Sequence, residues 1–482
     1  MKHKLLFPSE SQKILKAVHH FAGGRRVKLY LVGGALRDLI LGRARENPDF
    51  DFAVKKGAIS FGRQMAREFK CGFVVLDREH GSCRLVKKSG DNFYTLDFTD
   101  FRGASLEDDL KRRDFTINSI ALKLEDALSG SDFSPLLIDP CSGLPDIRKR
   151  IIRAVNKASF SEDPLRVMRA FSFCALLGFA IHKDTLKYAR LYKDKLPGVS
   201  AERIRDELFK VFASDKAYEC FLRLDKIRIL DIIFPEIKKM RKIGQGPYHH
   251  LDVWQHTLET LKQLEAIFSA LKSQEILDYL NAVISGQRKR RELLKFGAFL
   301  HDFGKPKALR RIKGKTIFHG HERIGLGMAQ DIAKRLKLSN DEVYSLHKMV
   351  LWHLRPGYLA DSEHPTARAK FRYFRDAGIE SLSIILLSLA DQRATKGPLT
   401  TPKARTQHEK IVGRLIKEHL DRGKEEKPQR LLNGDEVMRR FGLKPSPLVG
   451  RILSLVDELQ GIGRIKTKEE AFKAASRLAK SK

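Results

Sequence analysis

The chain has 482 residues, of which 42% are hydrophobic and 31% charged, and its 92 Lys and Arg outnumber 59 Asp and Glu to give a net charge of +33. This composition indicates a folded protein of several domains and excludes a chain that is disordered throughout. Because the positive excess is spread along the chain, it favours a polyanionic partner such as a nucleic acid.

The five cysteines stand far apart and have no C-x-x-C spacing, which indicates a reducing compartment and excludes a zinc knuckle. No apolar run approaches the roughly 18 residues of a membrane span, and the N-terminus lacks the apolar core of a signal peptide. We therefore expect a cytoplasmic protein with no membrane partner. The sequence leaves the oligomeric state open.

Up to about residue 155, short strand patterns recur along the chain. Helical stretches lie between some of them, at 35–43 and 58–69. Alternating or short apolar runs bounded by Gly, Asn and Asp predict strands. These runs are VKLYLVGG (27–34), DFDFAV (49–54), CGFVVLD (71–77), CRLVKK (83–88), NFYTLDF (92–98) and TINSIAL (116–122). The first region is therefore a mixture of α and β elements.

From about residue 160, apolar residues recur every three or four positions, which predicts amphipathic helices. Breaks rich in Gly, Pro and charged residues follow at 243–250, 395–407 and 422–430 and indicate boundaries. We divide the chain into a mixed part and three helical parts, namely 1–155, 156–242, 243–395 and 396–482.

The run LVGGALRDLILGRARENPDFDFAV (31–54) begins with a glycine pair where a strand meets a helix. Gly33 and Gly34 can bring backbone N–H groups close to a phosphate at the start of that helix, and Arg37 can pair with a phosphate oxygen. A plain turn is the commoner use of a glycine pair, so the pair alone does not decide between the two.

The same run ends with Asp49 and Asp51, which lie at i and i+2 on a predicted strand and so project from one face. Like charges repel there unless divalent cations bind, and two cations bridged by carboxylates are the apparatus of in-line phosphoryl transfer. Asp97 can supply a third carboxylate, whereas Asp100 points to the opposite face. Taken alone, Asp-x-Asp is also common at exposed strand ends.

Together these residues resemble the signature of the class II nucleotidyltransferases that build tRNA 3′ ends or poly(A) tails: a glycine pair, an Arg-Asp helix and then Asp-x-Asp. Later family motifs are resembled, in the family's order, by RRDFTINSIAL (112–122), DPCSGLPDIRKRIIRAV (139–155), SEDPLRVMRAFSF (161–173) and ERIRDELFKVF (202–212). The resemblance implies an α+β fold, with a small, mostly antiparallel sheet flanked by helices in the head (1–155) and an all-helical neck, HD domain and tail.

The resemblance also implies the roles of individual residues. Asp49, Asp51 and Asp97 are its catalytic carboxylates, with Mg²⁺ held by the first two. Asp163 and Arg166 read the incoming base, and Glu162 braces the arginine. The other nucleotide-binding residues that it implies are Gly33, Gly34, Arg37, Arg112, Arg113, Asp114, Asn118 and Arg169.

A carboxylate acceptor beside a guanidinium donor complements both cytosine and adenine and mismatches guanine and uracil, so the protein itself would act as the template for CTP and ATP. The segment 162–166 has a simpler alternative: if it is helical, Glu162 and Arg166 lie at i and i+4, as in an ordinary surface salt bridge. Asn118 likewise has an alternative as a buried structural amide.

The part 243–395 holds four metal-ligand candidates in the order that resembles the HD phosphohydrolase superfamily, namely His256, His301, Asp302 and Asp391. Mixed nitrogen and oxygen ligands suit Mn, Fe, Ni, Co or Mg. His321 and His353 extend the set to a second metal or are ordinary histidines. The resemblance implies a phosphatase or cyclic phosphodiesterase, and a degenerate structural domain is the alternative.

The segment LLNGDEVMRRFGLKPSPLVGRILSLVDELQ (431–460) resembles the family's C-terminal helical part, which grips the elbow of tRNA. Only nine residues separate Arg102 from Arg112. Full CCA-adding members often carry a longer loop there, so the short loop favours an enzyme that adds only CC or only the terminal A. A poly(A) polymerase, a basic RNA-binding phosphohydrolase with an inactive transferase domain, and a nonenzymatic RNA-binding module are the alternatives.

Overall fold

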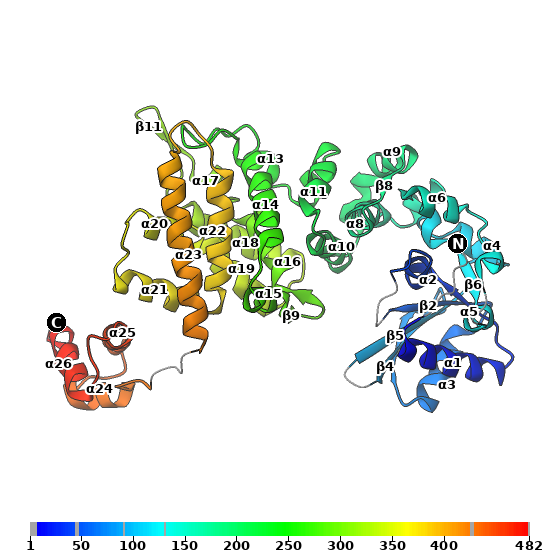
Figure 1. Ribbon diagram of the computed structural model, residues 1–482, viewed down its shortest axis with the longest axis horizontal. Coiled ribbons are helices and arrows are strands. Elements are labelled where there is room, and N and C mark those ends of the chain that lie inside the picture. Colours follow the sequence, from blue (N-terminus) through cyan, green and yellow to red (C-terminus); the bar gives the residue numbers. More distant parts are fainter. Residues whose placement is uncertain (1–6, 44–47, 90–91, 130–131, 425–428, 481–482) are drawn as a thin grey trace. The chain divides into compact units, whose positions relative to one another are not determined.

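The computed structural model describes residues 7–43, 48–89, 92–129, 132–424 and 429–480. The chain forms two compact units, residues 1–211 and 212–482, which we treat separately (Figure 1). The first unit contains one large sheet, and the second is almost entirely helical. The expected α+β fold with a helical remainder is therefore confirmed.

Six strands of the first unit form one sheet in the order β3-β4-β5-β2-β1-β6. Only β2 and β5 run parallel among these neighbours, so the sheet is mostly antiparallel, as predicted. The strands are β1 (Leu29–Val32), β2 (Phe50–Val54), β3 (Gly72–Asp77), β4 (Ser82–Ser89), β5 (Asn92–Asp100) and β6 (Ala121–Lys123).

One face of this sheet carries the apolar core of the head. Helix α3 (Ala58–Glu68) packs on β4 and β5, and helix α1 (Ser9–Gly23) contributes Phe21 to the aromatic cluster beside it. Phe52 and Phe98 are register partners on β2 and β5, and their rings stack 5.0 Å apart. Because strand residues alternate between faces, the carboxylates one position earlier project from the other face.

The remaining helices of the first unit connect and extend the sheet. They are α2 (Gly33–Ile40), α4 (Leu106–Lys111), α5 (Leu124–Leu128), α6 (Gly143–Lys149), α7 (Ala158–Glu162), α8 (Arg166–Leu177), α9 (Lys183–Tyr192) and α10 (Ala201–Ala213). Two short strands, β7 (Ile151–Ile152) and β8 (Ala180–Ile181), pair in parallel.

The predicted strand over residues 116–122 is wrong for most of its length. Residues Thr116–Asn118 form a 3₁₀ turn, and β6 begins only at Ala121. The Thr116 hydroxyl donates to Asp146 at 2.8 Å, and its carbonyl lies so close to Gly143 that a Cβ there would come within 2.1 Å of the oxygen. Packing against α6 therefore overrides the β-type pattern of these residues.

The second unit is built around α22 (Ser381–Ala394), which is buried on nearly all sides. It packs against α14 (Val253–Ala270), α16 (Arg290–Leu300) and α23 (Pro402–Lys424). The other helices before α23 are α11 (Ala217–Lys226), α12 (Leu230–Ile233), α13 (Ile237–Met240), α15 (Gln274–Asn281), α17 (Lys305–Ala308), α18 (His321–Arg335), α19 (Asn340–Trp352), α20 (Arg355–Ala360) and α21 (Ala367–Ala377). Two hairpins, β9–β10 (Val283–Ser285, Arg288–Lys289) and β11–β12 (Arg310–Ile312, Lys315–Ile317), interrupt them.

The tail helices α24 (Gly434–Phe441), α25 (Pro447–Gly461) and α26 (Lys468–Ala479) surround a core of their own that includes Val437, Ile452 and Val456. Within the second unit, Glu458 of α25 accepts a 2.7 Å hydrogen bond from Arg372 of α21. Among the described residues, no helix has both the length and the apolar content needed to cross a membrane.

Candidate active site and metal cluster

Asp51 and Asp97 lie side by side on the face of the sheet opposite the Phe52–Phe98 core. They are register partners in the parallel pair β2–β5, and Arg84 is the partner of Asp97 on β4. Arg84 donates to both carboxylate oxygens of Asp97, each at 2.8 Å. Asp49 lies one residue before β2 and is exposed. The structure thus brings the three predicted carboxylates to one face.

The environment of Asp51 makes its carboxyl harder to ionise than a free aspartate. Burial and then the neighbouring Asp97 raise the pKa of Asp51 to about 6, while Arg113 opposes the rise. The backbone N–H of Gly34 hydrogen-bonds this carboxylate. Because burial and like charge both disfavour the carboxylate ion, a divalent cation would lower the free energy of the ionised site.

Gly33 is required by the position of Asp51. Its φ is 74°, in the left-handed region, and a Cβ at this position would lie 2.6 Å from Asp51 Oδ2. Only glycine combines this backbone conformation with such close approach. The glycine pair therefore leaves the space that the Asp51 carboxylate occupies, a role that the sequence pattern did not reveal.

A cavity of about 520 Å³ opens over these carboxylates, a volume typical of small-ligand sites. The predicted residues that line it are Gly33, Gly34, Arg37, Asp49, Asp51, Arg113, Asp114, Asn118, Asp163, Arg166 and Arg169. Asp97, Arg112 and Glu162 are not among its lining residues. Further cations that the sequence analysis missed are also in the lining, namely Arg102, Arg203 and Lys210.

Arg37 and Asn118 belong to a buried hydrogen-bond network. Arg37 donates to Asn118 Oδ1 at 2.8 Å and to Asp38 at 2.6 and 2.8 Å. Asn118 in turn donates to Asp114 at 3.1 Å, and Arg169 donates to the other Asp114 oxygen at 2.7 and 2.9 Å. Much of the donor capacity of Arg37 is thus used within the protein.

The same network fixes the charge state of Asp114. Burial opposes ionisation, but the guanidinium groups of Arg169 and Arg166 outweigh it and hold the pKa of Asp114 at about 2. Both arginines of the network lie over the ring of Phe173, with guanidinium carbons 5.2 Å (Arg37) and 5.3 Å (Arg169) from its centroid. Phe173, which also lines the cavity, was not recognised from the sequence because one aromatic residue on a helix is usually core.

Residues 162–166 do not form one helix. Helix α7 ends at Glu162, α8 begins at Arg166, and Pro164 lies between them. Proline disfavours a helical conformation at the residue before it, which explains the break. Arg166 donates to the backbone carbonyls of Arg112 and Arg113 at 3.1 and 3.4 Å, so the i, i+4 pair considered for a continuous helix is not formed.

Asp163 accepts a hydrogen bond from Arg203 at 2.8 Å. Both Asp163 and Arg166 line the cavity and therefore can reach a ligand in it. A carboxylate acceptor and a guanidinium donor are the groups that complement the hydrogen-bonding edge shared by cytosine and adenine.

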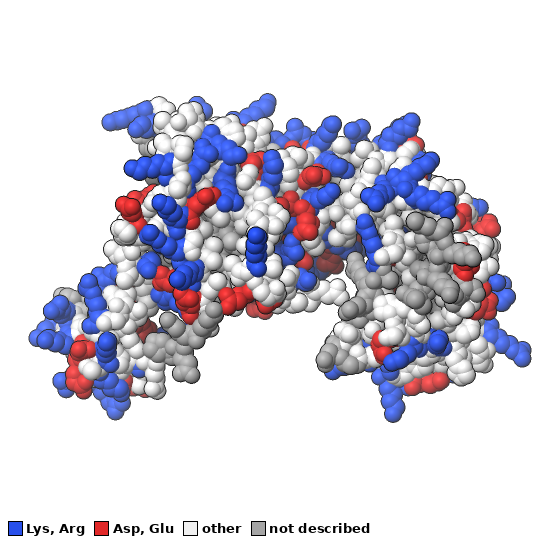
Figure 2. Space-filling view, in the orientation of Figure 1, with Lys and Arg blue, Asp and Glu red and all other residues white. Residues whose placement is uncertain are grey.

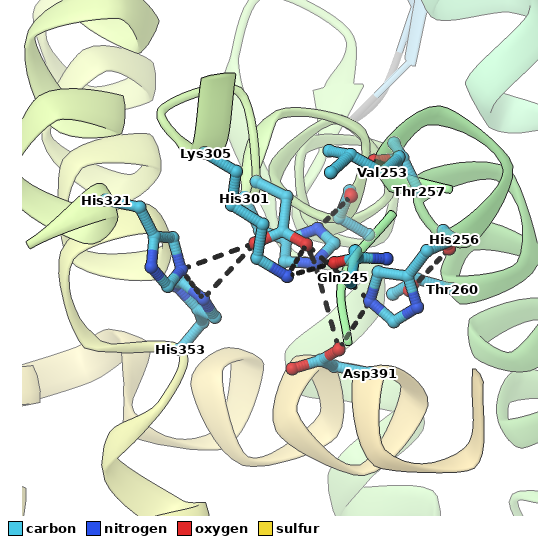
Figure 3. Close-up of polar contacts among 12 residues, drawn as sticks. Gln245, Val253, His256, Thr257, Thr260, His301, Lys305, His321, His353 and Asp391 are labelled. Carbon is cyan, nitrogen blue, oxygen red and sulfur yellow. Dashed lines mark hydrogen bonds and ion pairs between the residues drawn. The ribbon is translucent and has the colours of Figure 1, made fainter. Parts of the chain in front are cut away.

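All six metal-ligand candidates of the second unit converge on one centre (Figure 3). They come from α14, the end of α16, the start of α18, the end of α19 and α22. His256, His301 and Asp391 have ligand atoms within 4.8 Å of one another, and so do Asp302, His321 and His353. The predicted set is thus brought together in full.

Three of these histidines are oriented by backbone carbonyls. The Nδ1 atoms of His301, His321 and His353 lie 2.7 to 2.8 Å from the carbonyl oxygens of residues 298, 318 and 350. A carbonyl only accepts, so Nδ1 carries the hydrogen and, in the neutral ring, Nε2 has the lone pair. His301 Nε2 lies 3.2 Å and His321 Nε2 3.3 Å from Asp302.

Asp302 is the buried centre of the cluster. Both of its oxygens lack a hydrogen bond of good geometry within the described part of the chain, although Lys305 Nζ lies 2.6 Å from one of them. Burial opposes ionisation, but His301 and Lys305 hold the pKa of Asp302 well below its usual range. Burial and the neighbouring His301 lower the pKa of His353 to about 3, so this ring is neutral. Imidazole nitrogens around a buried carboxylate form a donor set that fits a divalent cation.

The sequence analysis missed three neighbours of this cluster. Lys305 donates to Gln245 at 2.6 Å (Figure 3). The ring of His249 lies 4.9 Å from that of His256. Burial and then Lys305 lower the pKa of His249 to about 3. The sequence signals for them were the GKP that follows the His-Asp doublet and the YHH that precedes His256.

Three family models match successive parts of the chain. Residues 29–153 match the poly A polymerase head domain, residues 178–240 the probable RNA and SrmB-binding site of polymerase A, and residues 253–396 the HD domain.

Named relatives match almost the whole chain. The A-adding tRNA nucleotidyltransferase of Deinococcus radiodurans is 32% identical over 92% of this chain and 93% of its own length. The CC-adding tRNA nucleotidyltransferase of Synechocystis is 28% identical over 94% of both chains. A CCA-adding enzyme of Thermotoga maritima, solved with tRNA, has the same fold, with a TM-score of 0.60 and 20% identity over 97% of this chain and 95% of its own.

Proposed function

Since this chain belongs to the tRNA nucleotidyltransferase family, we propose that its first unit adds nucleotides from CTP or ATP to the 3′ end of tRNA without a nucleic-acid template. The observation that carries the proposal is the Asp51–Asp97 register pair, with Asp49 beside it, under a cavity lined by cationic side chains. Lys and Arg side chains on the faces visible in Figure 2 provide the charge for a polyanionic substrate.

In this mechanism the tRNA 3′ oxygen attacks the α-phosphorus of the nucleotide, and the bond from that phosphorus to the departing pyrophosphate breaks. Asp49 and Asp51 would hold Mg²⁺, which activates the hydroxyl and stabilises the leaving group. Arg102 and Arg113, which line the cavity, would contact the triphosphate, and Asp163 and Arg166 would contact the base. Asp97 would be the third carboxylate of the site, beside Asp51, and its hydrogen bonds with Arg84 fix its orientation.

We further propose that the enzyme is of the partial type and adds the terminal A. The connection from β5 to α4 is short, and α4 begins with a capping box in which Ser105 and Asp108 exchange hydrogen bonds. Asp109 ties the Arg102 backbone and the Arg113 side chain together. Such a braced connection leaves little freedom to switch between two bases, and the A-adding relative is 32% identical over nearly its full length.

The test offers labelled CTP or ATP with tRNA that ends before CC, after CC, or complete. We expect label from ATP only, and only on tRNA that ends in CC. Incorporation of CTP would overturn the terminal-A assignment but not the transferase function. Failure of all three tRNAs to accept either label would remove the transferase function itself.

We propose that the HD cluster is a second active site, a phosphohydrolase that uses Mn, Fe, Ni, Co or Mg and acts on phosphate at RNA 3′ ends. The convergence of His256, Asp302 and Asp391 supports it. Hydrolysis of bis(p-nitrophenyl) phosphate and of RNA ending in a 2′,3′-cyclic phosphate, measured with each metal in turn, tests the activity. Absence of hydrolysis with every metal would leave the cluster a structural one.

We keep the four-part division as a proposal: head 1–155, neck 156–242, HD domain 243–395 and tail 396–482. In it, the tail helices α24 to α26 bind tRNA through its phosphates. We also retain the prediction of a cytoplasmic location.

A further inference from the structure

A basic hairpin leaves the second unit next to the HD cluster. We define it as residues 307–317, which include the antiparallel strands β11 and β12 (Figure 1). Lys313 and Gly314 form its two-residue turn, and both have positive φ, 49° and 75°. This is the type I′ geometry that matches the twist of a tight hairpin. The hairpin is thus a defined element rather than an irregular loop.

The hairpin has an unbalanced charge. Residues 305–317 contain six Lys and Arg and no acidic residue. The five cations of the hairpin itself are exposed, and the described part of the chain offers none of them an ion-pair partner; they are Lys307, Arg310, Arg311, Lys313 and Lys315. Other exposed arginines of this unit do have partners, such as Arg335 with Glu236 and Arg430 with Asp457. Lys and Arg side chains gather in Figure 2 around the end of the unit where Figure 1 labels β11.

The hairpin contributes little to the core. All three side chains of β11 are exposed, and Ile312 near the turn has an exposed fraction of 52%. A two-stranded ribbon of this length is marginally stable in water by itself. The basic hairpin therefore exposes its cations and the apolar side chain of Ile312 without contributing to the packing of the fold.

Both ends of the hairpin are fixed to the HD cluster. Before it, Lys305 reaches Asp302 and lies 5.6 Å from the ring centroid of Phe318. After it, the carbonyl of Phe318 is hydrogen-bonded by Nδ1 of His321, at 2.8 Å. The hairpin is thus flanked in the sequence by two metal-ligand candidates, Asp302 and His321, and a ligand bound to it would lie near them.

We propose that the basic hairpin binds the phosphate backbone of single-stranded RNA beside the HD cluster. The choice of RNA rests on the proposed function, and charge complementarity supplies the affinity. A single strand is favoured because His301 and Asp302 are almost completely buried, so a free chain end reaches them more easily than a duplex. Each strand of the hairpin is about 10 Å long, which suits contacts to a few successive phosphates.

The test uses the full chain and a 12-nucleotide RNA with a 5′ fluorescein, and it measures binding by fluorescence anisotropy at several salt concentrations. We expect Arg310→Glu/Arg311→Glu to weaken binding at least five-fold and to reduce the salt slope by about 1 to 1.5, since each single-strand phosphate contact contributes about 0.7. The matched control is Lys272→Glu/Lys334→Glu, which changes two exposed lysines of the same unit outside the hairpin and outside residues 178–240.

A five-fold loss in the hairpin variant, with the control within two-fold of the parent, supports the proposal. A smaller loss, or an equal loss in the control, overturns it. The binding signal requires neither nucleotide addition nor hydrolysis. Failure of the hairpin proposal is therefore distinguishable from failure of either proposed activity, which the tRNA-labelling and phosphodiester assays measure separately.

Discussion

Asp51 of β2 and Asp97 of β5 are direct register partners on parallel strands, and Arg84 on the next strand holds Asp97 with two hydrogen bonds of 2.8 Å. One row of the sheet therefore carries two carboxylates but only one guanidinium, and Asp49 adds a third negative charge beside them. Burial and then this surplus of negative charge raise the pKa of Asp51, and both favour the binding of a divalent cation at the row.

Removing either carboxylate of the Asp-x-Asp pair should abolish nucleotide addition. For Asp49→Ala and Asp51→Ala we expect incorporation of labelled nucleotide into tRNA to fall by about three orders of magnitude, because metal and positioning are lost together. His301→Ala, which removes a ligand of the other site, should retain the parent rate within two-fold. A large loss in His301→Ala would mean that the two sites are not independent.

Asp51→Asn should stabilise the metal-free protein. The folded-state pKa of Asp51 is about 6, above the ordinary 3.8, so the stability linked to its proton is present below about pH 4 and lost as the pH rises through 6. Asparagine avoids that loss, and we expect a gain of about 1 to 3 kcal/mol at pH 7.5 in chelator. Urea unfolding at pH 7.5 and pH 4 measures it. A gain of equal size at both pH values would contradict the electrostatic cause.

Asp114→Asn should have the opposite effect. The folded-state pKa of Asp114 is about 2, so its ionised form contributes stability that is present above about pH 4 and lost as the pH falls toward 2. The change also leaves Arg169 without its carboxylate partner at Asp114. We expect a loss of about 2 kcal/mol or more at pH 7.5, measured in the same urea titration. An unchanged midpoint would show that the network contributes little to stability.

Gly33→Ala and Gly34→Ala form a matched pair. A Cβ at Gly33 meets Asp51 Oδ2 at 2.6 Å on a backbone of positive φ, whereas a Cβ at Gly34 meets only Arg37 Nη2 at 3.6 Å. We therefore expect Gly33→Ala to lower the free energy of unfolding by about 1 to 3 kcal/mol and Gly34→Ala by less than about 1. Equal losses of unfolding free energy in the two variants would indicate that a methyl group at position 33 does not strain the structure around Asp51.

The phosphodiester hydrolysis that we propose for the second unit should depend on Asp302. In Asp302→Asn we expect hydrolysis of bis(p-nitrophenyl) phosphate to fall at least about 100-fold, because an amide is a poorer metal ligand than a carboxylate. Addition of nucleotide to tRNA should stay within two-fold of the parent. Metal content after dialysis, measured by mass spectrometry, should fall in parallel.

The sequence predicted the elements with strong periodicity and the residues that share a local pattern. The strands before residue 100, the helices after 160 and the Asp-x-Asp face are examples, since each depends on spacing within a few residues. The strand predicted over 116–122 was wrong for residues 116–120, because the Thr116 side chain bonds to α6, which is distant in the sequence. Local pattern contains no information about such a partner.

The residues of the candidate sites divide in the same way, into those that a sequence pattern revealed and those that it did not. The histidines and carboxylates of the HD cluster were recognisable because their order along the chain resembles that of the HD phosphohydrolase superfamily. Arg84, Phe173 and Lys210 were not, because an arginine on a strand, a phenylalanine on a helix and a surface lysine are ordinary. The break at Pro164 could have been anticipated from proline geometry. The hydrogen bonds of Arg166 to backbone carbonyls could not.

The bonds that run from Arg37 through Asn118 and Asp114 to Arg169 join α2, the turn after α4 and α8. A chimaera that exchanges residues beyond about 160 with those of a differently specific relative would cut this chain between Asp114 and Arg169. Asp114 and Arg169 therefore have to come from the same parent protein, or be changed together. Otherwise a chimaera that acquires a new base preference would lose the hydrogen bonds that hold its catalytic site together.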